Sequence, residues 1–276
     1  MNKKKILISD YDGTLCEVNS QINKETLDLF HSLADMGIVR AIATGRSLFS
    51  ARKVLDQSFP IDYLIFSSGA GLMDWREQKI IYNNYLEPSD TESIASILLK
   101  EKKDFMIHDI IPNNHYFDYF QLTDGNSDFE HRIKIYQQYA KQVKGDYQYK
   151  EASQLLAVLP PDTDFFFLEQ KLLDTYSVIH ATSPLDHQSR WIEIFPKNIS
   201  KAKTAQYLCE LLEIDSQNAM AIGNDFNDLD MLEWAGSAFL VENAHEDIKN
   251  KFFNVASCKN NGIIEATKLW LDNYGS

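Results

Sequence analysis

Ile6-Leu7-Ile8-Ser9-Asp10-Tyr11-Asp12-Gly13-Thr14 is the stretch of sequence that decides the fold. A short apolar run that ends in acidic residues and a glycine predicts a buried strand of a parallel sheet, stopping at a functional loop. Asp10 and Asp12 alternate across this turn, so the side chain of Tyr11 is expected to point elsewhere. Asp and Gly are also ordinary turn formers, and the stretch alone is compatible with a plain strand-ending turn.

The residues that follow repeat a strand-helix-strand pattern. Asn23 can cap a helix whose apolar residues recur at helical spacing, and Gly37 stands where a helix stop belongs. The further expected strands are 39–43, 63–66, 219–222 and 238–241, and the further expected helices are around 48–55, 202–212 and 229–235. Alternation of this kind predicts an α/β fold with a doubly wound parallel sheet.

Between about residues 85 and 184 the sequence changes character. Aromatic-rich alternating runs, such as 105–108 and 115–120, with helices between them, predict an inserted α+β domain. We therefore expect a core of residues 1–84 and 185–276 and an insertion of residues 85–184. The run Phe165-Phe166-Phe167-Leu168 is interpreted as a buried strand in the core of the insertion.

Charge and composition exclude several classes of partner. The chain has 27 Lys and Arg against 40 Asp and Glu, a net charge of -13, which repels nucleic acids and anionic membranes. No apolar run approaches the roughly 20 residues of a membrane-spanning helix, and the run after the basic N-terminus is too short for a signal peptide. Three cysteines without a C-x-x-C pair argue against a disulfide framework. The sequence therefore predicts a cytoplasmic protein.

Polar residues follow three of the predicted strands, at the edge of the sheet where ligands of open α/β folds bind. The three strand ends and the start of one helix supply Asp10 and Asp12, Thr44-Gly45-Arg46, Gly223-Asn224-Asp225-Phe226-Asn227-Asp228, and Lys201. Paired carboxylates can act as nucleophile and general acid in phosphoryl transfer, provided that a cation screens the negative phosphoester. Oxygen ligands without His or Cys pairs favour Mg²⁺ over zinc.

These runs, D-Y-D-G-T-L at 10–15, T-G-R at 44–46, Lys201 and G-N-D-F-N-D at 223–228, resemble the four motifs of the haloacid dehalogenase superfamily, in the family's order. The long insertion resembles the C2B cap of its Cof-type branch, so the resemblance spans essentially the whole chain. It implies a Rossmannoid core and a Mg²⁺-dependent phosphatase that hydrolyses a small organic phosphomonoester, such as a sugar phosphate, through an aspartyl-phosphate.

The resemblance also implies a role for each motif. Asp10 would attack phosphorus, and Asp12 would protonate the leaving oxygen and then activate water. Thr44 would hydrogen-bond the transferring group, and Lys201 would neutralise charge on it and on Asp10. The Asp10 carboxylate, the Asp12 carbonyl and the fourth motif would hold Mg²⁺. The residues expected to bind phosphate or substrate are Tyr11, Gly45, Arg46, Ser68, Gly69 and Asn227.

The fourth motif departs from the family's G-D-x-x-N-D, because Asn224 stands where the metal-binding aspartate is expected. An amide oxygen can bind Mg²⁺, although hard divalent cations prefer carboxylates. Asp225 is the alternative ligand, directly or through water, but adjacent side chains point to different sides and only one can occupy the position. We favour Asn224. Asp228 is expected to fix Lys201 or a metal-bound water.

A second departure is Ser67-Ser68-Gly69-Ala70, where many Cof-type relatives have Asn-Gly-Ala, which affects substrate preference more than catalysis. A plain Ser-Gly turn explains it equally well.

In the insertion, His108, Asp109 and 113–116 could contact a sugar or ring, although a solvated hairpin is the better interpretation. No carboxylate or Cys spacing supports zinc at His108 and His115. Arg190 and Trp191 are further candidates for substrate contact.

Two other functions share these motifs. A phosphomutase would pass the phosphoryl group from Asp10 to a second hydroxyl instead of water. A regulatory protein would bind a phosphorylated ligand with little turnover, a reading that the amide at Asn224 keeps open.

Overall fold

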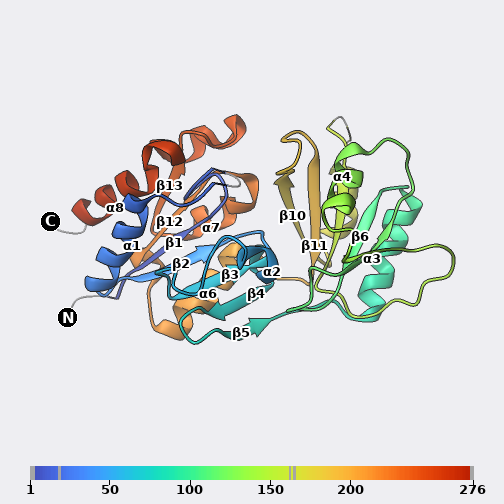
Figure 1. Ribbon diagram of the computed structural model, residues 1–276, viewed down its shortest axis with the longest axis horizontal. Helices are drawn as coiled ribbons and strands as arrows, with labels where there is room; N and C mark the ends of the chain where they lie inside the picture. Colours follow the sequence, from blue (N-terminus) through green and yellow to red (C-terminus); the bar gives the residue numbers. More distant parts are fainter. Residues whose placement is uncertain (1–3, 18–19, 162, 164–165, 274–276) are drawn as a thin grey trace. The chain divides into compact units, whose positions relative to one another are not determined.

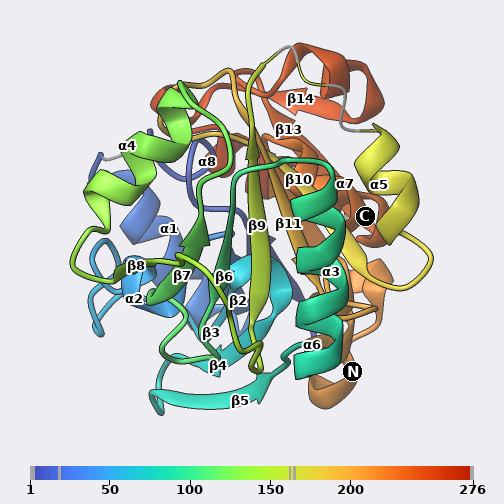
Figure 2. The same cartoon turned by 90° about the vertical axis from the view of Figure 1, so that its right-hand side faces the viewer.

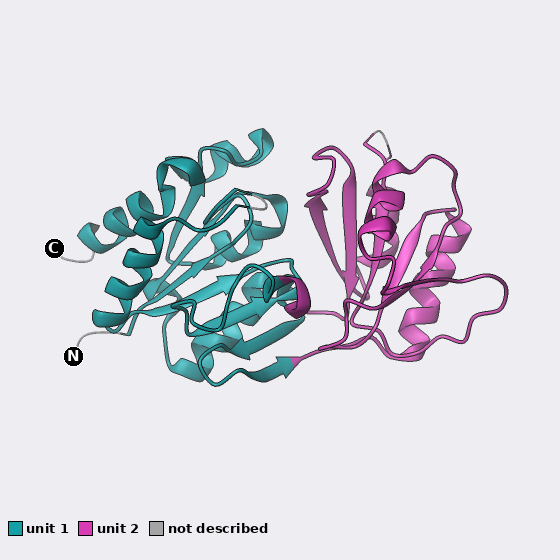
Figure 3. Ribbon diagram, in the orientation of Figure 1, with its two compact units in different colours: residues 1–46, 51–82, 200–276 teal, residues 47–50, 83–199 magenta. Residues whose placement is uncertain are grey.

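The computed structural model describes residues 4–17, 20–161, 163 and 166–273, which form two compact units (Figure 3). The first unit comprises the described residues of 1–46, 51–82 and 200–276, and the second those of 47–50 and 83–199.

An eight-stranded sheet forms the centre of the first unit (Figure 1). Its strands are β1 (Ile6–Ser9), β2 (Val39–Ala43), β3 (Tyr63–Phe66), β4 (Gly71–Asp74), β5 (Lys79–Asn83), β12 (Ala219–Gly223), β13 (Ser237–Val241) and β14 (Phe253–Val255). They lie in the order β14-β13-β12-β1-β2-β3-β4-β5, parallel from β14 to β3, with β4 antiparallel to β3. The central strand is β1, whose Ile8 is in register with Ala221 on one side and Ala41 on the other.

Helices cover both faces of this sheet, which confirms the predicted doubly wound α/β fold. The helices of the first unit are α1 (Lys24–Asp35), α6 (Lys201–Leu212), α7 (Leu229–Trp234) and α8 (Gly262–Asn273). A further helix, α2 (Leu48–Ala51), belongs to the second unit except for Ala51, although the sequence places it in the core. The 3₁₀ turns are η1 (Ser67–Gly69), η2 (Ser216–Asn218), η3 (Phe226–Asp228), η4 (Glu246–Lys251) and η5 (Cys258–Asn260). The Asn23 side chain caps α1 by accepting from the Thr26 N–H at 2.8 Å, as expected. The helix expected at 48–55 is shorter in the structure, where α2 spans Leu48–Ala51.

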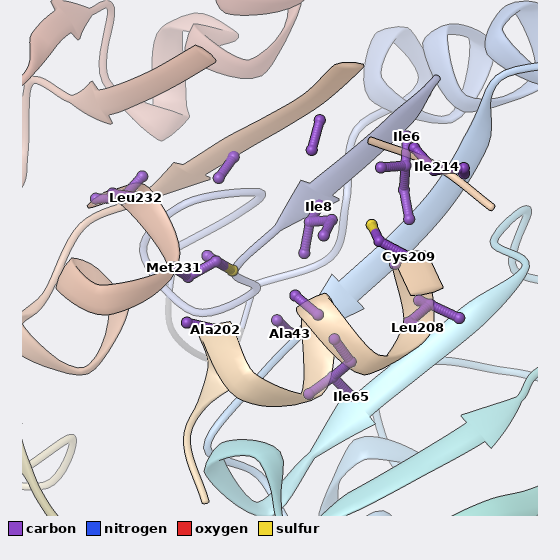
Figure 4. Packing of buried hydrophobic residues seen from close by; sticks show 14 of the residues in the cluster. Ile6, Ile8, Ala43, Ile65, Ala202, Leu208, Cys209, Ile214, Met231 and Leu232 are labelled. Carbon is purple, nitrogen blue, oxygen red and sulfur yellow. The ribbon is translucent and has the colours of Figure 1, made fainter. Parts of the chain in front are cut away.

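The packing of helices on both faces of the sheet explains why Ile6, Leu7 and Ile8 of β1 are all apolar. Ile6 and Ile8 belong to one buried cluster with Leu208 of α6 and Met231 of α7 (Figure 4). Small side chains on both sides, such as Ala43 on β2 and Ala202 on α6, allow the helix to approach the sheet closely. On the other face α1 and α8 contact each other. A strand buried on both faces has no solvent side, so its apolar run is continuous.

A six-stranded sheet forms the centre of the second unit (Figure 2). Its strands are β6 (Phe105–His108), β7 (Phe117–Phe120), β8 (Ala140–Gln142), β9 (Gln154–Leu159), β10 (Ser177–Thr182) and β11 (Arg190–Phe195), and its helices are α3 (Pro88–Lys100), α4 (Ser127–Ile135) and α5 (Phe166–Leu172). The order is β10-β11-β9-β6-β7-β8, antiparallel except between β7 and β8. Side chains of α3 and α5 pack on one face, and Phe129 of α4 packs on the other.

Two expectations about this unit differ from the structure. The sequence predicts the return to the core at residue 185, whereas the second unit extends to Ile199, because β11 pairs between β9 and β10 in its sheet. The run interpreted as a buried strand is helical from Phe166, with Phe166 61% and Phe167 50% exposed. Only Leu168 and, one turn later, Leu172 are buried, a spacing of four that is helical. Phe165 lies outside the described residues.

Within the ranges described above, no helix combines the length and the hydrophobicity that crossing a membrane requires.

Two leucines on α6 test how much the core between sheet and helix contributes to stability. Leu208 is fully buried, whereas Leu211 is 52% exposed on the same helix. We expect Leu208→Ala to lower the free energy of unfolding by about 3 kcal/mol, because it leaves a cavity. The matched Leu211→Ala should cost less than about 1 kcal/mol. Urea unfolding followed by circular dichroism measures both, and equal losses would contradict this packing.

Candidate active site

The carboxyl ends of β1, β2 and β12 bring the residues of three predicted motifs to one edge of the sheet. The Asp10 N–H donates to the Ile222 carbonyl at 3.0 Å, so Asp10 continues the pairing of β1 with β12. Thr44 follows β2, where its N–H donates to the Ile65 carbonyl at 2.9 Å. Because β1 lies between β12 and β2, Asp10 has a strand end on either side.

A buried ammonium group holds two of these carboxylates together. Lys201 Nζ donates to Asp10 Oδ1 at 2.8 Å and to Asp228 Oδ1 at 2.6 Å. The side chains of Lys201 and Asp228 are fully buried and that of Asp10 is 8% exposed. Two carboxylates share one ammonium, so the buried group carries an excess negative charge.

The pKa values of this group follow from its burial and its charges. Burial and, after it, the Asp228 carboxylate raise the pKa of Asp10 to about 7, against the opposing effect of the Lys201 ammonium. Burial alone lowers the pKa of Lys201, but the two adjacent carboxylates outweigh it and raise that pKa above its ordinary value. Lys201 therefore stays charged, and Asp10 favours any further cation that approaches it.

Asp228 also orders the loop that follows β12. Its Oδ2 accepts from the Asn224 N–H at 2.9 Å and from the Asp225 N–H at 3.1 Å. A Cβ atom at Gly223 would lie 2.6 Å from the Asp228 carboxylate, so only glycine allows the loop to close this tightly. Asp228 thus links Lys201 to the position of Asn224, as expected for a supporting residue.

The side-chain amide of Asn224 lies against the turn after β1. One of its two terminal atoms is 3.1 Å from Asp10 Oδ2, 3.0 Å from the Asp12 carbonyl oxygen and 3.0 Å from Thr14 Oγ1. With nitrogen at this point the amide donates to all three oxygens, whereas oxygen there would face the first two as a second acceptor. The Thr14 hydroxyl in turn donates to Asp10 Oδ2 at 3.1 Å. No role for Thr14 was predicted.

Asp225, the alternative metal ligand, has a different set of contacts. Its Oδ1 accepts from the Phe226 N–H at 2.8 Å, and together with Asp228 it forms a capping box at η3. The amide of the neighbouring Asn224 contacts Asp10 and Asp12.

Asp12 and Arg46 form a bidentate ion pair, with both N–O distances 2.6 Å. The pair joins the expected general acid to an expected phosphate-binding residue. The Arg46 guanidinium also lies 5.5 Å from the centre of the Tyr11 ring. Tyr11 is only 2% exposed, so its ring is buried at this turn.

Gly45 lies beside two other expected phosphate-binding residues. A Cβ atom at Gly45 would be 3.4 Å from Ser68 Oγ and 3.6 Å from Asn227 Nδ2, so three motifs converge at this point. Ser68 has a φ of 53°, in the left-handed region, and Gly69 has a φ of 102°. Non-glycine residues in this conformation are often found at functional sites, which supports a functional reading of Ser68 over a plain turn.

The polar residues singled out in the second unit do not form one site. His108 is buried, and its Nδ1 lies 2.8 Å from the Asn114 carbonyl oxygen. Asp109 pairs with Lys150 at 2.6 Å, and the His115 ring stacks on Phe49 with ring centres 4.1 Å apart. Asn113 and Tyr116 close a turn by the Tyr116 N–H, which donates to the Asn113 carbonyl at 2.9 Å. These contacts favour the hairpin interpretation.

Trp191, a candidate for substrate contact, is instead buried in the core of the second unit. Its Nε1 donates to Asp128 Oδ2 at 2.7 Å, and the Arg132 guanidinium lies 4.3 Å above its ring. The sequence suggested contact because Trp191 was assigned to the return segment, but β11 places it inside the sheet. Arg190, on the same strand, is partly exposed.

Asn243 and His245 are two residues at this edge that the sequence reasoning missed. Asn243 Nδ2 donates to the Gly13 carbonyl at 2.7 Å, and the His245 N–H donates to the Asn224 carbonyl at 3.1 Å. Both follow β13, whose last residue is Val241. The strand-end rule that identified Asp10 and Thr44 identifies Asn243 too, once it is applied to β13.

Comparison with known families and structures gives evidence of the family of this chain that is independent of the site geometry. A family model described as haloacid dehalogenase-like hydrolase matches residues 7–266. The Bacillus subtilis protein YxeH, named only as a candidate phosphatase, is 26% identical over 275 residues, covering 95% of this chain and 96% of its own. The 5-amino-6-(5-phospho-D-ribitylamino)uracil phosphatase YwtE of the same organism is 25% identical, covering 94% of this chain and 95% of its own.

Solved structures share the whole fold. BT1666, a phosphatase from Bacteroides thetaiotaomicron, superposes with a TM-score of 0.78 at 22% identity, covering 97% of this chain and 95% of its own. The subclass IIB sugar phosphatase BT4131 superposes with a TM-score of 0.76 at 20% identity, covering 97% of this chain and 99% of its own.

His108 makes the stability of the protein depend on pH. Burial lowers its pKa to about 3, with the Arg132 charge adding to the shift, whereas the unfolded chain has a His pKa of about 6.5. Below pH 6.5 the unfolded state binds a proton that the folded state does not, so stability falls as pH falls. From pH 7 to pH 5 we expect this residue to cost about 2 kcal/mol.

The comparison is between the wild type and His108→Gln, each unfolded in urea at both pH values. When the pH falls from 7 to 5, the wild type should lose about 2 kcal/mol more unfolding free energy than the variant. A difference that does not change with pH would contradict the assignment of His108 as a buried, neutral imidazole.

Proposed function

Because this chain belongs to the haloacid dehalogenase-like hydrolase family, we propose that it is a Mg²⁺-dependent phosphatase that hydrolyses a small organic phosphomonoester through an aspartyl-phosphate on Asp10. The observation that carries the proposal is the buried contact between Lys201 Nζ and Asp10 Oδ1 at 2.8 Å. A carboxylate at a strand end attacks a negatively charged phosphoester only if its own charge and that of the phosphate are neutralised nearby.

The residues around Asp10 fit a magnesium ion. Asp10 Oδ2 and the Asp12 carbonyl oxygen both lie about 3 Å from one terminal atom of the Asn224 amide, and a hard cation prefers oxygen ligands of this kind. Among the described residues no group of three or more His, Cys, Asp or Glu side chains could hold a metal, so the site would combine the Asp10 carboxylate with backbone and amide oxygens. When bound, Mg²⁺ would supply positive charge against the phosphate.

The Asn224 amide fits the site both without and with a bound cation. Its nitrogen donates to Asp10 and Asp12 in the arrangement described, and a half-turn about its last torsion would present the oxygen to a cation instead. Asp225, whose Oδ1 is engaged by the Phe226 N–H, is the weaker candidate. We therefore propose Asp10, Asp12 and Asn224 as the metal ligands.

The residues of the chain then divide the reaction between them. Asp10 attacks phosphorus as the ester bond breaks, and Asp12 donates a proton to the leaving oxygen. In the second step Asp12 accepts a proton from water, which attacks the aspartyl-phosphate and releases phosphate and free Asp10. A phosphate oxyanion competes with Asp12 for the Arg46 guanidinium, so substrate binding would free Asp12 to exchange its proton.

The remaining polar residues of the site would orient the phosphoryl group. Thr44 Oγ1 accepts from the Arg46 N–H at 3.1 Å, so its own proton is available to a phosphate oxygen. Ser68 and Asn227 present donors beside Gly45, where the missing Cβ lets a phosphate approach the backbone. We propose that these residues, with Gly69, form the phosphate pocket.

The substrate class is inferred from the relatives. YwtE is named for a phosphate on a ribityl chain and BT4131 is described as a sugar phosphatase. A phosphorylated sugar or sugar alcohol is therefore the leading substrate class.

We propose that the first unit is the catalytic core and that the second unit, residues 47–50 and 83–199, selects the leaving group. Three free, buried cysteines, Cys16, Cys209 and Cys258, are compatible with the reducing cytoplasm.

Asp10→Asn tests the nucleophile. The amide cannot form the acyl-phosphate, so Mg²⁺-dependent phosphate release from an aryl phosphate and from a panel of sugar phosphates should fall at least about a thousandfold. The control Asp35→Asn changes an exposed aspartate at the end of α1 and should keep wild-type turnover. Turnover retained in Asp10→Asn would exclude the mechanism.

Asn224→Asp tests the metal ligand. A carboxylate binds Mg²⁺ more strongly than an amide oxygen, so the Mg²⁺ concentration for half-maximal phosphate release should fall about tenfold. The matched Asp225→Asn keeps an oxygen for the Phe226 N–H and should leave this concentration within about twofold. An unchanged requirement in Asn224→Asp, together with a weakened one in Asp225→Asn, would assign the ligand to Asp225.

A further inference from the structure

Residues 242–245, the segment between β13 and η4, contact both loops that meet at the proposed metal site. Asn243 Nδ2 donates to the Gly13 carbonyl at 2.7 Å, in the turn after β1. The His245 N–H donates to the Asn224 carbonyl at 3.1 Å, in the loop after β12. One short segment therefore holds a backbone carbonyl from each of the two loops.

Asn243 is itself held at its other end. Its Oδ1 accepts from the Cys258 N–H at 2.9 Å, at the start of η5. The amide thus uses its acceptor on one part of the chain and its donor on another, which fixes the direction in which Nδ2 points. The residue is exposed, so its contribution to apolar packing is small and its hydrogen bonds are its main contacts.

The Gly13 carbonyl is important because Gly13 directly follows Asp12, whose carbonyl oxygen is a proposed metal ligand. The Gly13 N–H donates to the Cys16 carbonyl at 2.8 Å, and this N–H shares a planar peptide group with the Asp12 carbonyl of the proposed metal site. Gly13 has a φ of 78°, and a Cβ atom there would lie 2.6 Å from the Asn224 amide. Glycine is the residue with the most backbone freedom, so its peptide groups hold their direction only if both sides are bound. Cys16 binds one side and Asn243 the other.

We propose that Asn243 is a positioning residue for the cation site, acting through the Gly13 carbonyl on the direction of the Asp12 carbonyl and on its spacing from Asn224. The inference rests on the proposed function, because it presumes a cation held by Asp10, Asp12 and Asn224. Residues that orient metal ligands without touching the metal commonly change affinity by about 10- to 100-fold when they are replaced.

Two substitutions separate this role from others. Asn243→Asp keeps an acceptor for the Cys258 N–H but replaces the donor to Gly13 with an oxygen. Its added negative charge would by itself strengthen cation binding, so a loss of affinity can only come from the lost donor. Asn243→Ala removes both contacts. The matched controls are Asn254→Asp and Asn254→Ala, because Asn254 is also exposed and donates to the Lys249 carbonyl at 2.8 Å.

The measurements are the dissociation constant of Mg²⁺ by isothermal titration calorimetry and the Tm in EDTA by circular dichroism. Both Asn243 variants should bind Mg²⁺ about tenfold more weakly than the wild type, with a metal-free Tm within about 2 °C of it. Both Asn254 variants should match the wild type in affinity. A merely structural role of Asn243 would instead lower the metal-free Tm and leave the affinity unchanged.

The outcomes distinguish this inference from the proposed function. Asn243 variants that bind Mg²⁺ as tightly as a normally binding wild type would overturn the positioning role alone. An equal loss in the Asn254 variants would overturn it too, because the effect would not be specific to Gly13. Wild-type protein that binds no Mg²⁺ would overturn the metal-dependent function and this inference together.

Discussion

The arrangement of the first unit depends on one buried ammonium group, that of Lys201 between Asp10 and Asp228. An ammonium without charged partners is too costly to bury, and so are two carboxylates without a cation. The three side chains can be buried only together, which requires the start of α6, the end of β1 and η3 to meet. Asp228 then orders the backbone of Asn224, so the same contact sets the loop after β12.

The remaining charge of this group explains the chemistry of the site. One lysine cannot neutralise two carboxylates, and burial raises the pKa of Asp10, because its charged form is disfavoured without more positive charge. The Asn224 amide and the Thr14 hydroxyl satisfy the second oxygen of Asp10 by hydrogen bonds. An amide at residue 224 adds no further negative charge to the site, which an aspartate would do. The departure from the family pattern is thus compatible with a well-ordered site in the absence of metal.

Most of the site could be predicted because its residues directly follow apolar strands. Asp10, Thr44 and Asn224 needed only the strand ends and the rule that parallel strands share an edge. Thr14 and Asn243 were missed because they act on other residues of the site, Asp10 and Gly13, and no local pattern marks such contacts. Phe166 and Phe167 were misassigned because a short apolar run has no periodicity that separates strand from helix.

The sequence by itself determined the doubly wound sheet, the family and the place of Asp10 and Asp12 at the end of the first strand, since each depends on residue types at fixed short spacings along the chain. Only the tertiary structure decided that Arg46 pairs with Asp12, that the Asn224 amide contacts Asp10, and that residues 190–195 belong to the second sheet. These features depend on contacts between distant segments. The order and register in which the strands pair decide which polar groups meet. That pairing joins segments that are far apart in the sequence, so no local sequence pattern reveals it.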